Sequence, residues 1–324
     1  LAERMFGGTP DLPAYKVVFI ASGIGMVISL LWFWVGRAQL KGIGAAPQEA
    51  QGLGRVAMVI AGCVVAVPVV FFLLTIPASV LNWILLALFI GPAIMLLVEG
   101  IRLGKVQRDM VIAMLIIFGF NVLFWMFFEQ AGSSFNFLAQ NIVERRFGDW
   151  VFPVGWFQSV NSIAIITLAP VLAWLWVKMG PANPSIPRKF GLGLIFNGLA
   201  FLLLMFALSS LVDPQTLKIP FWTLFMVYVI QSVGELCLSP IGLSMTTKLA
   251  PAKLTGLAMG GWFLSISIGN NLSGIFASAV SGEGGMTTES ALAGYTFGFW
   301  ALLGAGVLLF LVAPLIQKLM HGVK

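Results

Sequence analysis

Nine long runs of apolar residues, separated by short segments that carry charge or proline, dominate the sequence. Within a run such as 80–98, apolar side chains occupy nearly every position, so the run shows neither the alternation of a half-buried strand nor the stripe of a surface helix. A helix needs about 20 such residues to cross the hydrocarbon core of a bilayer. The pattern therefore predicts nine transmembrane α-helices, at residues 15–36, 55–75, 79–101, 110–134, 153–177, 190–211, 220–244, 254–280 and 292–317.

The composition fits a chain whose surroundings are lipid. Of the 324 residues, 59% are hydrophobic and 9% are charged, and the mean hydropathy is +1.00. A typical soluble domain carries about a quarter charged residues, so soluble enzymes, nucleic-acid-binding domains and disordered tails are excluded together. Two isolated cysteines and a single histidine, His321, offer neither a disulfide framework nor a cluster of metal ligands. We therefore expect no metal and no cofactor.

The basic residues divide unequally between the two sides that nine crossings create. Thirteen of the 18 Lys and Arg fall on one side, and the other side receives Arg4, Lys16, Arg145, Arg146 and Lys218. By the positive-inside rule the richer side is cytoplasmic, which places the C-terminus inside and Leu1 in an external loop. Because the sequence starts in mid-loop without methionine, we expect that an upstream part of the protein precedes it.

Two glutamates lie inside the predicted spans. Glu129 falls near the outer end of the fourth span, and Glu235 lies slightly to the inner side of the midplane in the seventh. A carboxylate in hydrocarbon costs a few kcal/mol or more, so it usually faces a protein interior or a water-filled cavity. No Lys or Arg lies deep in these spans, so each acid is protonated, or paired with an outside base or a cationic ligand. The alternative is an acid that is interfacial or merely hydrogen-bonded within the bundle.

Polar and aromatic side chains accompany both acids at helical spacing. Trp125 precedes Glu129 by four residues and Ser239 follows Glu235 by four, so each pair shares a helix face. An aromatic wall beside an acid makes a surface that favours cations. Asn161 is a third polar residue well inside a span, where it either contacts a ligand or makes an interhelical hydrogen bond.

Glycine and proline mark where these helices are expected to approach closely or bend. Gly256 and Gly260 form a GxxxG pattern, whose usual explanation is close packing of two helix backbones. Trp262, on the same predicted helix, faces either a cavity or lipid. Pro240 directly follows Ser239 and removes a backbone donor at the level of the acid, so we expect a loosened helix that is suited to a gate.

Four segments resemble motifs of the proton-dependent oligopeptide transporter family of the major facilitator superfamily. They are FWMFFEQAGSSFNF, GWFQSVNSI, GELCLSPIGLSMTTKLAP and GWFLSISIGN, in the family's order, and the resemblance covers essentially the whole chain. It implies an all-α membrane protein with a partial major facilitator fold. The last helix of the N-terminal bundle would lie in 1–41, an inserted two-helix linker hairpin in 42–104, and the six-helix C-terminal bundle in 105–324.

The resemblance also implies a function, which is proton-coupled import of di- and tripeptides by alternating access across a bacterial inner (cytoplasmic) membrane. By the family pattern, Glu235 would receive the amino terminus of the peptide, with Asn161 hydrogen-bonded to it and Ser239 nearby at the inner gate. The family's ExxER motif and the basic residues that receive the peptide carboxylate have no counterpart here. The chain would therefore need an N-terminal six-helix bundle as its partner.

The remaining implied roles concern proton coupling and side-chain pockets. Glu129 would pair with a basic residue of the other bundle when the outer gate closes, and its protonation would weaken that contact. Trp125 and Trp262 would line pockets for peptide side chains. The implied partners are thus peptides, protons, the lipid bilayer and the N-terminal bundle.

Three other interpretations compete with this one. A carrier of the same superfamily would transport another substrate, as drug exporters and nitrate or sugar carriers do, although the acid at Glu235 favours a cationic group. A membrane-embedded enzyme would need paired intramembrane aspartates or several histidines, and the sequence offers neither. A third possibility is an accessory half-subunit that does not transport.

Overall fold

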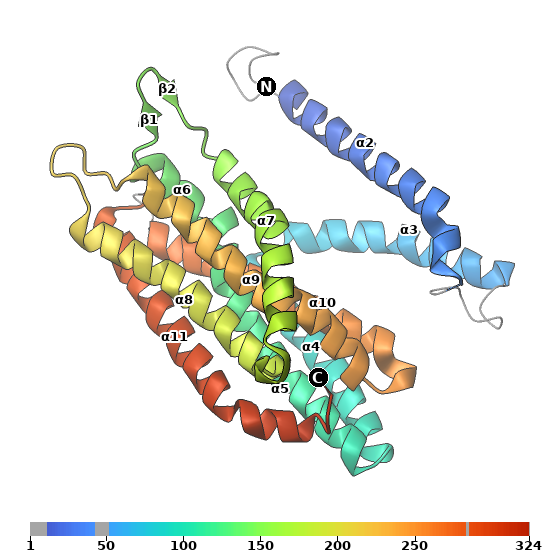
Figure 1. The fold of residues 1–324 in the computed structure, drawn as a ribbon. Coiled ribbons are helices and arrows are strands. Elements are labelled where there is room, and N and C mark those ends of the chain that lie inside the picture. The colour runs from blue at the N-terminus through green and yellow to red at the C-terminus, as the bar shows by residue number, and fades with distance from the viewer. Residues whose placement is uncertain (1–11, 43–51, 283–284, 324) are drawn as a thin grey trace. The chain divides into compact units, whose positions relative to one another are not determined.

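A computed structural model describes residues 12–42, 52–282 and 285–323, and within these residues nine helices are long and apolar enough to cross a membrane. They are α2 (Leu12–Gly36), α3 (Leu53–Thr75), α4 (Ala78–Arg102), α5 (Lys105–Phe128), α7 (Trp156–Lys178), α8 (Ile186–Ser210), α9 (Phe221–Leu249), α10 (Thr255–Ser281) and α11 (Thr288–Leu319) (Figure 1). The predicted spans and the all-helical class are confirmed.

Shorter elements connect the long helices. They are the 3-10 helices η1 (Arg37–Leu40), η3 (Glu129–Gly132), η4 (Gly180–Ala182) and η5 (Ala252–Leu254), the helix α6 (Ser134–Asn141), and the strands β1 (Arg146–Phe147) and β2 (Trp150–Val151). The two strands form an antiparallel hairpin in which Arg146 pairs with Val151. This ribbon was not predicted, because two-residue strands leave no periodic pattern in the sequence.

Local signals set helix ends that hydropathy alone misses. α5 begins at Lys105 rather than at 110, directly after Gly104, whose φ of 104° favours glycine. α11 begins with a capping box in which the Thr287 and Ser290 side chains bond each other's backbone N–H groups. Pro251 follows the C-terminus of α9 and prevents its continuation. Polar residues at a span's end therefore extend the helix beyond its apolar run.

The chain forms two compact units, residues 1–75 and 76–324. In the first unit, α2 and α3 expose nearly all of their described apolar side chains, for example Trp32 and Phe71. In the second, α4 packs on α5 and α10, although the sequence grouped it with the 42–104 hairpin. The predicted domain boundaries themselves stay predictions.

The helices α5 and α7 to α11 enclose the interior of the second unit. α8 packs along α11 and α9, α5 packs along α10, and α7 contacts α9 (Figure 1). Buried aromatic rings fill the centre, where Phe135 makes edge contacts with Tyr228 and Tyr295. These helices are apolar on all sides, so their packing depends on shape and on a few polar contacts rather than on amphipathic faces.

The hairpin end of this unit carries one surface ion pair. Lys218 Nζ lies 3.4 Å from Glu144 Oε2, and the backbone N–H of Arg146 donates to Glu144 Oε1. The Arg146 hydrogen bond, together with Lys218, lowers the pKa of the Glu144 carboxyl. Both groups are solvent-accessible, so the pair orients the loop and contributes little to stability.

Candidate substrate-binding site

The helix that leads to Glu129 ends one residue before this acid. α5 stops at Phe128, and Glu129 opens the 3-10 turn η3, whereas the sequence predicted an unbroken helix to residue 134. The break leaves backbone carbonyls without helical donors. Ser133 Oγ donates to the Glu129 carbonyl at 3.0 Å, and the Tyr228 hydroxyl donates to the Ala131 carbonyl at 2.9 Å. The carboxylate thus lies at a discontinuity that other side chains stabilise.

Glu235 is held by a residue of a neighbouring helix. Asn161 Nδ2, on α7, donates to Glu235 Oε2 on α9 at 3.0 Å, and to Ser232 Oγ at 3.0 Å. Glu235 and Asn161 are both half-buried. The interhelical role considered for Asn161 is therefore present, and its partner is the predicted ligand-binding acid.

A series of hydrogen-bonded residues connects this acid with the break in the helix beside Glu129. Ser232 Oγ donates to the Tyr228 carbonyl at 2.7 Å, and the Tyr228 hydroxyl reaches Ala131 in η3. Ser232 and Tyr228 were not among the predicted site residues. Their spacing of three and seven residues before Glu235 places them near its helix face and was the available signal.

Neither acid forms an ion pair with any Lys, Arg or His among the described residues. The acids that do so lie elsewhere: Glu99 with Arg102, Asp109 with Arg108 and His321, and Glu144 with Lys218. Within the described ranges, the only side-chain donor to the Glu235 carboxylate is the amide of Asn161. A site of this kind favours an incoming cation.

Ser239 lies one helical turn beyond Glu235 and is half-buried, in keeping with its predicted place near the acid. α9 continues through Pro240 to Leu249, so proline does not end the helix. Proline nevertheless removes the donor for the carbonyl four residues earlier, that of Leu236, directly beside the acid. A gating role for this point stays a prediction.

Trp125 and Trp262 belong to a second series of hydrogen-bonded residues, which links α5 and α10. Trp125 Nε1 donates to Asn121 Oδ1 at 3.1 Å, and Asn121 Nδ2 donates to Ser265 Oγ at 2.7 Å. Ser265 Oγ in turn donates to the Trp262 carbonyl at 2.6 Å. Both rings are buried, with exposed fractions of 9% for Trp125 and 1% for Trp262. Asn121 and Ser265 were not among the predicted site residues.

Trp262 belongs to the packed interior rather than to a pocket wall. Its ring makes edge contacts with Phe118 and Phe190, and it fills the space that a side chain at Gly242 would need. The prediction that Trp262 lines a side-chain pocket is therefore not supported by its position. A tryptophan followed by polar residues looks the same in the sequence whether its ring faces a cavity or the core.

The GxxxG prediction is wrong for the packing within the described residues. A Cβ at Gly256 or Gly260 would meet nothing within 4 Å. The close approach of α10 to α5 occurs instead at Gly269, where a Cβ would come within 2.7 Å of the Trp125 Cβ and 2.8 Å of the Val122 carbonyl. Motif spacing identified the helix but not the glycine that makes the contact.

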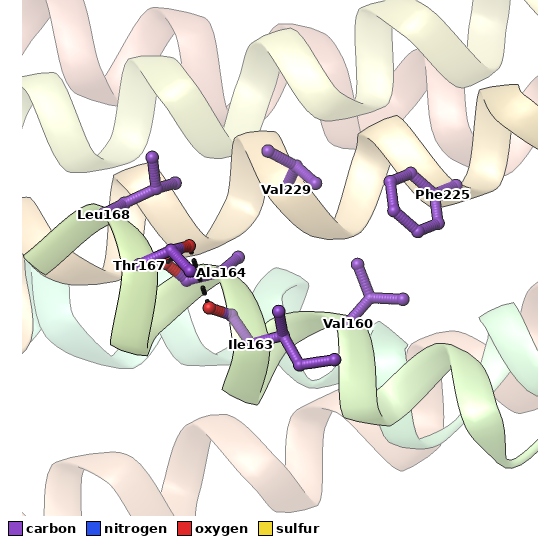
Figure 2. A pocket seen from close by; sticks show the side chains of 7 residues that line it. All are labelled: Val160, Ile163, Ala164, Thr167, Leu168, Phe225 and Val229. Atoms are coloured by element: carbon purple, nitrogen blue, oxygen red, sulfur yellow. Dashed lines mark hydrogen bonds between the residues drawn. The ribbon is translucent and has the colours of Figure 1, made fainter.

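An apolar cavity of about 240 Å³ opens between α7 and α9 (Figure 2). Its lining includes Val160 and Ala164 from α7 and Phe225 and Val229 from α9. The Thr167 hydroxyl donates to backbone carbonyls and so presents little polarity to this space. Neither Asn161 nor Glu235 is among its lining residues, so the cavity is described apart from the acid. No pattern in the sequence predicted this cavity.

Comparison with known proteins places these features among transporters. A family model described as the POT family matches residues 11–289. The chain is 30% identical to the uncharacterized transporter YclF of Bacillus subtilis, with 100% of this chain and 65% of that protein covered. It is also 30% identical to dipeptide and tripeptide permease B of Aeromonas hydrophila, with 96% and 64% covered.

Solved structures give the same result. A crystal structure of a peptide transporter POT in complex with sulfate matches with a TM-score of 0.70 at 30% identity, covering 95% of this chain and 63% of that one. A mutant of a peptide transporter POT in complex with alafosfalin matches with a TM-score of 0.72. The chain spans somewhat less than two thirds of the length of these relatives.

Proposed function

The chain belongs to the POT family, and on that premise we propose that it acts in the proton-coupled import of di- and tripeptides by alternating access. It is a multi-pass membrane protein. The proposal puts it in the bacterial inner membrane with a cytoplasmic C-terminus, as the distribution of Lys and Arg favours. Relatives named as dipeptide and tripeptide permeases support the substrate class.

One observation carries the proposal: a half-buried carboxylate within a membrane span is held by an amide and has no basic partner among the described residues. The amino terminus of a peptide supplies the missing positive charge. A hydrogen bond to a charged group contributes about 1.5–3 kcal/mol, which is enough to select peptides with a free amine. Glu235 is thus the proposed receptor for the ammonium group.

The neighbours of Glu235 have supporting roles in this proposal. Asn161 orients the carboxylate and keeps its second donor on Ser232. Ser239, one turn further along α9, offers a hydroxyl between the acid and the inner end of the helix. Trp125 stays a proposed pocket residue, although its ring is largely buried and its indole N–H donates to Asn121.

Glu129 is the proposed proton-coupling acid. It lies at the start of η3, where the regular helix has ended and the backbone is held by Ser133 and Tyr228. A charged Glu129 pairs with a base of the other bundle and closes the outer gate, whereas protonation releases that base. Peptide binding at Glu235 and protonation at Glu129 then bias the same two-state equilibrium.

The proposal requires partners that this chain does not supply. The peptide carboxylate needs a basic site, and neither acid of the site has a Lys or Arg beside it in the described ranges. An N-terminal six-helix bundle provides that site and the partner of Glu129. Residues 105–324 then act as the C-terminal bundle, after the last N-terminal helix in 1–41 and the linker hairpin in 42–104.

Uptake by the intact natural protein in proteoliposomes tests the substrate class. With an inward proton gradient, uptake of a labelled dipeptide is expected to be blocked by excess unlabelled di- and tripeptides, and unaffected by nitrate or simple amines. Inhibition by nitrate, sugars or drugs but not by peptides would contradict the proposal. Hydrolysis of the peptide by the purified protein would instead revive the enzyme interpretation.

Paired substitutions separate the two acids. Glu235→Gln removes the charge and is expected to abolish peptide binding. Glu129→Gln is expected to spare peptide exchange between two equal pools while it impairs accumulation driven by a pH gradient. Glu99→Gln is the matched control, because Glu99 pairs with Arg102 at the end of α4. Unchanged dipeptide affinity in Glu235→Gln would refute the assignment of Glu235.

A further inference from the structure

α8 and α11 approach closely at Gly191 and Gly306 and again at Gly198 and Leu302, and a cavity lies between them at the ends that carry basic residues. A Cβ at Gly191 would come within 3.0 Å of the Gly306 carbonyl, and a Cβ at Gly306 would come within 3.0 Å of the Gly191 carbonyl. About one turn beyond this contact, a cavity of about 350 Å³ separates the start of α8 from the end of α11. The cavity therefore opens at the boundary of two membrane spans.

This cavity is lined by two cations and little else that is charged. Its walls are Ser185 and Arg188 from the start of α8, and Pro314, Gln317 and Lys318 from the end of α11. Arg188 and Lys318 are both exposed, and neither forms an ion pair with any acid in the described ranges. Two positive charges thus border one cavity without a counter-charge from the described protein.

Both sides of the cavity are positioned by local contacts. The guanidinium of Arg188 lies over the Phe310 ring, 5.5 Å from its centroid, which holds this cation against α11. Gln317 Nε2 donates to the Val323 carbonyl at 2.8 Å, so the end of the chain folds back beside the same helix turn. Arg188 is therefore held at the cavity by a ring contact, and Lys318 follows on the helix turn that Gln317 ties to Val323.

The first turn of α8 adds donors of its own. Ser185 is the N-cap residue, but its hydroxyl makes no capping hydrogen bond. Pro187 has no N–H and the Lys189 N–H donates to the Ser185 carbonyl, which leaves the N–H groups of Ile186 and Arg188 without helical acceptors; such groups attract anions. Together with Arg188 and Lys318, they make the cavity complementary to a group that carries negative charge on several oxygens, such as a phosphate.

Apolar side chains next to the cations distinguish a lipid from a soluble anion. Leu308, Leu311 and Leu315 of α11 are exposed by 54%, 70% and 62%, and they lie within two to three turns of Lys318 on the membrane side. A phospholipid satisfies both surfaces, since its phosphate meets the cations while its acyl chains cover the leucines. Basic pockets between transmembrane helices are suited to such headgroups.

We propose that the cleft formed by Ser185, Arg188, Gln317 and Lys318 binds the phosphate group of an anionic phospholipid. The lipid fills the cavity between α8 and α11 and neutralises both cations. The site is separate from the Glu235 site, and the proposal does not depend on which substrate the protein transports.

Native mass spectrometry of the intact natural protein in detergent tests this site, with phosphatidylglycerol, phosphatidylcholine and inorganic phosphate as probes. The double variant Arg188→Gln/Lys318→Gln removes both cations. The matched control Arg102→Gln/Lys178→Gln removes one Arg and one Lys from other helix ends. Thermal unfolding of each variant without lipid verifies that it is folded.

The wild type and the control are expected to retain one tightly bound phosphatidylglycerol that the double variant loses. Each cation near an anionic headgroup contributes roughly a fivefold gain in affinity, so we expect about 25-fold weaker binding in the double variant. Equal phosphatidylglycerol binding by the double variant and the wild type would overturn the proposal. Equal binding of phosphatidylcholine, or stabilisation by inorganic phosphate as large as that by phosphatidylglycerol, would overturn the lipid assignment.

Discussion

At the scale of single residues, the contact between Asn161 and Glu235 gives the site its chemistry. The amide donates one hydrogen bond to the carboxylate and one to Ser232, so the acid is oriented without being neutralised. An arginine at this position would bind the acid permanently and leave nothing for a ligand's ammonium. A neutral donor keeps the carboxylate in place while its charge stays available.

Removal of the Asn161 amide tests whether it orients the Glu235 carboxylate for binding. Asn161→Leu keeps the approximate volume but removes both donors, and hydrogen bonds to charged groups contribute about 1.5–3 kcal/mol. We expect dipeptide affinity, measured by isothermal titration calorimetry, to fall about tenfold or more.

Asn183→Ala, in the exposed segment between α7 and α8, is the control and is expected to bind like the wild type. An Asn161→Leu variant with wild-type affinity would show that orientation of the carboxylate by this amide has no part in binding.

The sequence predicted the acids and Asn161 because polar residues in long apolar runs are conspicuous. It did not predict Ser232 and Tyr228, since a serine or a tyrosine in a span is common and only the fold shows where its hydroxyl points. The burial of the Trp262 ring was not foreseen for the related reason that the same ring suits a core as well as a cavity.

At the scale of helices, glycines determine which faces meet beside the site. Gly234 precedes Glu235 and packs against α8, where a Cβ would come within 2.8 Å of the Gly193 carbonyl. The absence of a side chain thus lets α8 approach α9 directly behind the acid. Because lipid does not drive helices together by the hydrophobic effect, such close contacts are a main source of helix association.

Substitution of this glycine is expected to push the two helices apart. In Gly234→Ala the new methyl group meets backbone atoms that cannot move independently, and overpacking of this kind costs about 1–3 kcal/mol. Thermal unfolding in detergent should show a lower midpoint.

The comparison is Gly260→Ala, at a position where a Cβ would meet nothing within 4 Å. Its midpoint is expected to be unchanged or raised, because alanine favours a helix over glycine by up to about 1 kcal/mol. A loss of stability in Gly260→Ala that equals the loss in Gly234→Ala would contradict the contacts described for these two glycines.

Hydropathy predicted every long helix but not how the helices end or where they touch. The break after Phe128 depends on Ser133 and Tyr228, which supply donors from the next turn and from another helix. The hairpin at 146–151 depends on backbone pairing over two residues per strand. Neither the helix break nor the hairpin produces a periodic pattern of apolar residues, so neither could be predicted from the sequence.

At the scale of the whole molecule, the charge distribution predicts an orientation that cysteine labelling can test. In a background of Cys63→Ala and Cys237→Ala, Asp149→Cys marks the tip of the hairpin and Lys253→Cys marks the turn between α9 and α10. Both positions are exposed. A membrane-impermeant maleimide added to intact cells is expected to label Asp149→Cys but not Lys253→Cys.

Permeabilised cells serve as the control, since both cysteines should then react. The opposite pattern in intact cells would reverse the predicted topology and place Ser239 toward the outside. Fold and family followed from the sequence at this scale, because hydropathy and motif order extend over the whole chain. The N-terminal bundle stays an expectation from the family resemblance, because the described residues show none of its contacts.

The ammonium group proposed to bind Glu235 can be tested most directly by comparing a dipeptide with its N-acetylated form. Binding of both ligands to the intact natural protein and to its Glu235→Gln variant is measured by isothermal titration calorimetry. The wild type is expected to lose affinity about tenfold or more on acetylation, whereas Glu235→Gln should give the free amine no advantage. A variant that still prefers the free amine by the wild-type factor would contradict the role of Glu235.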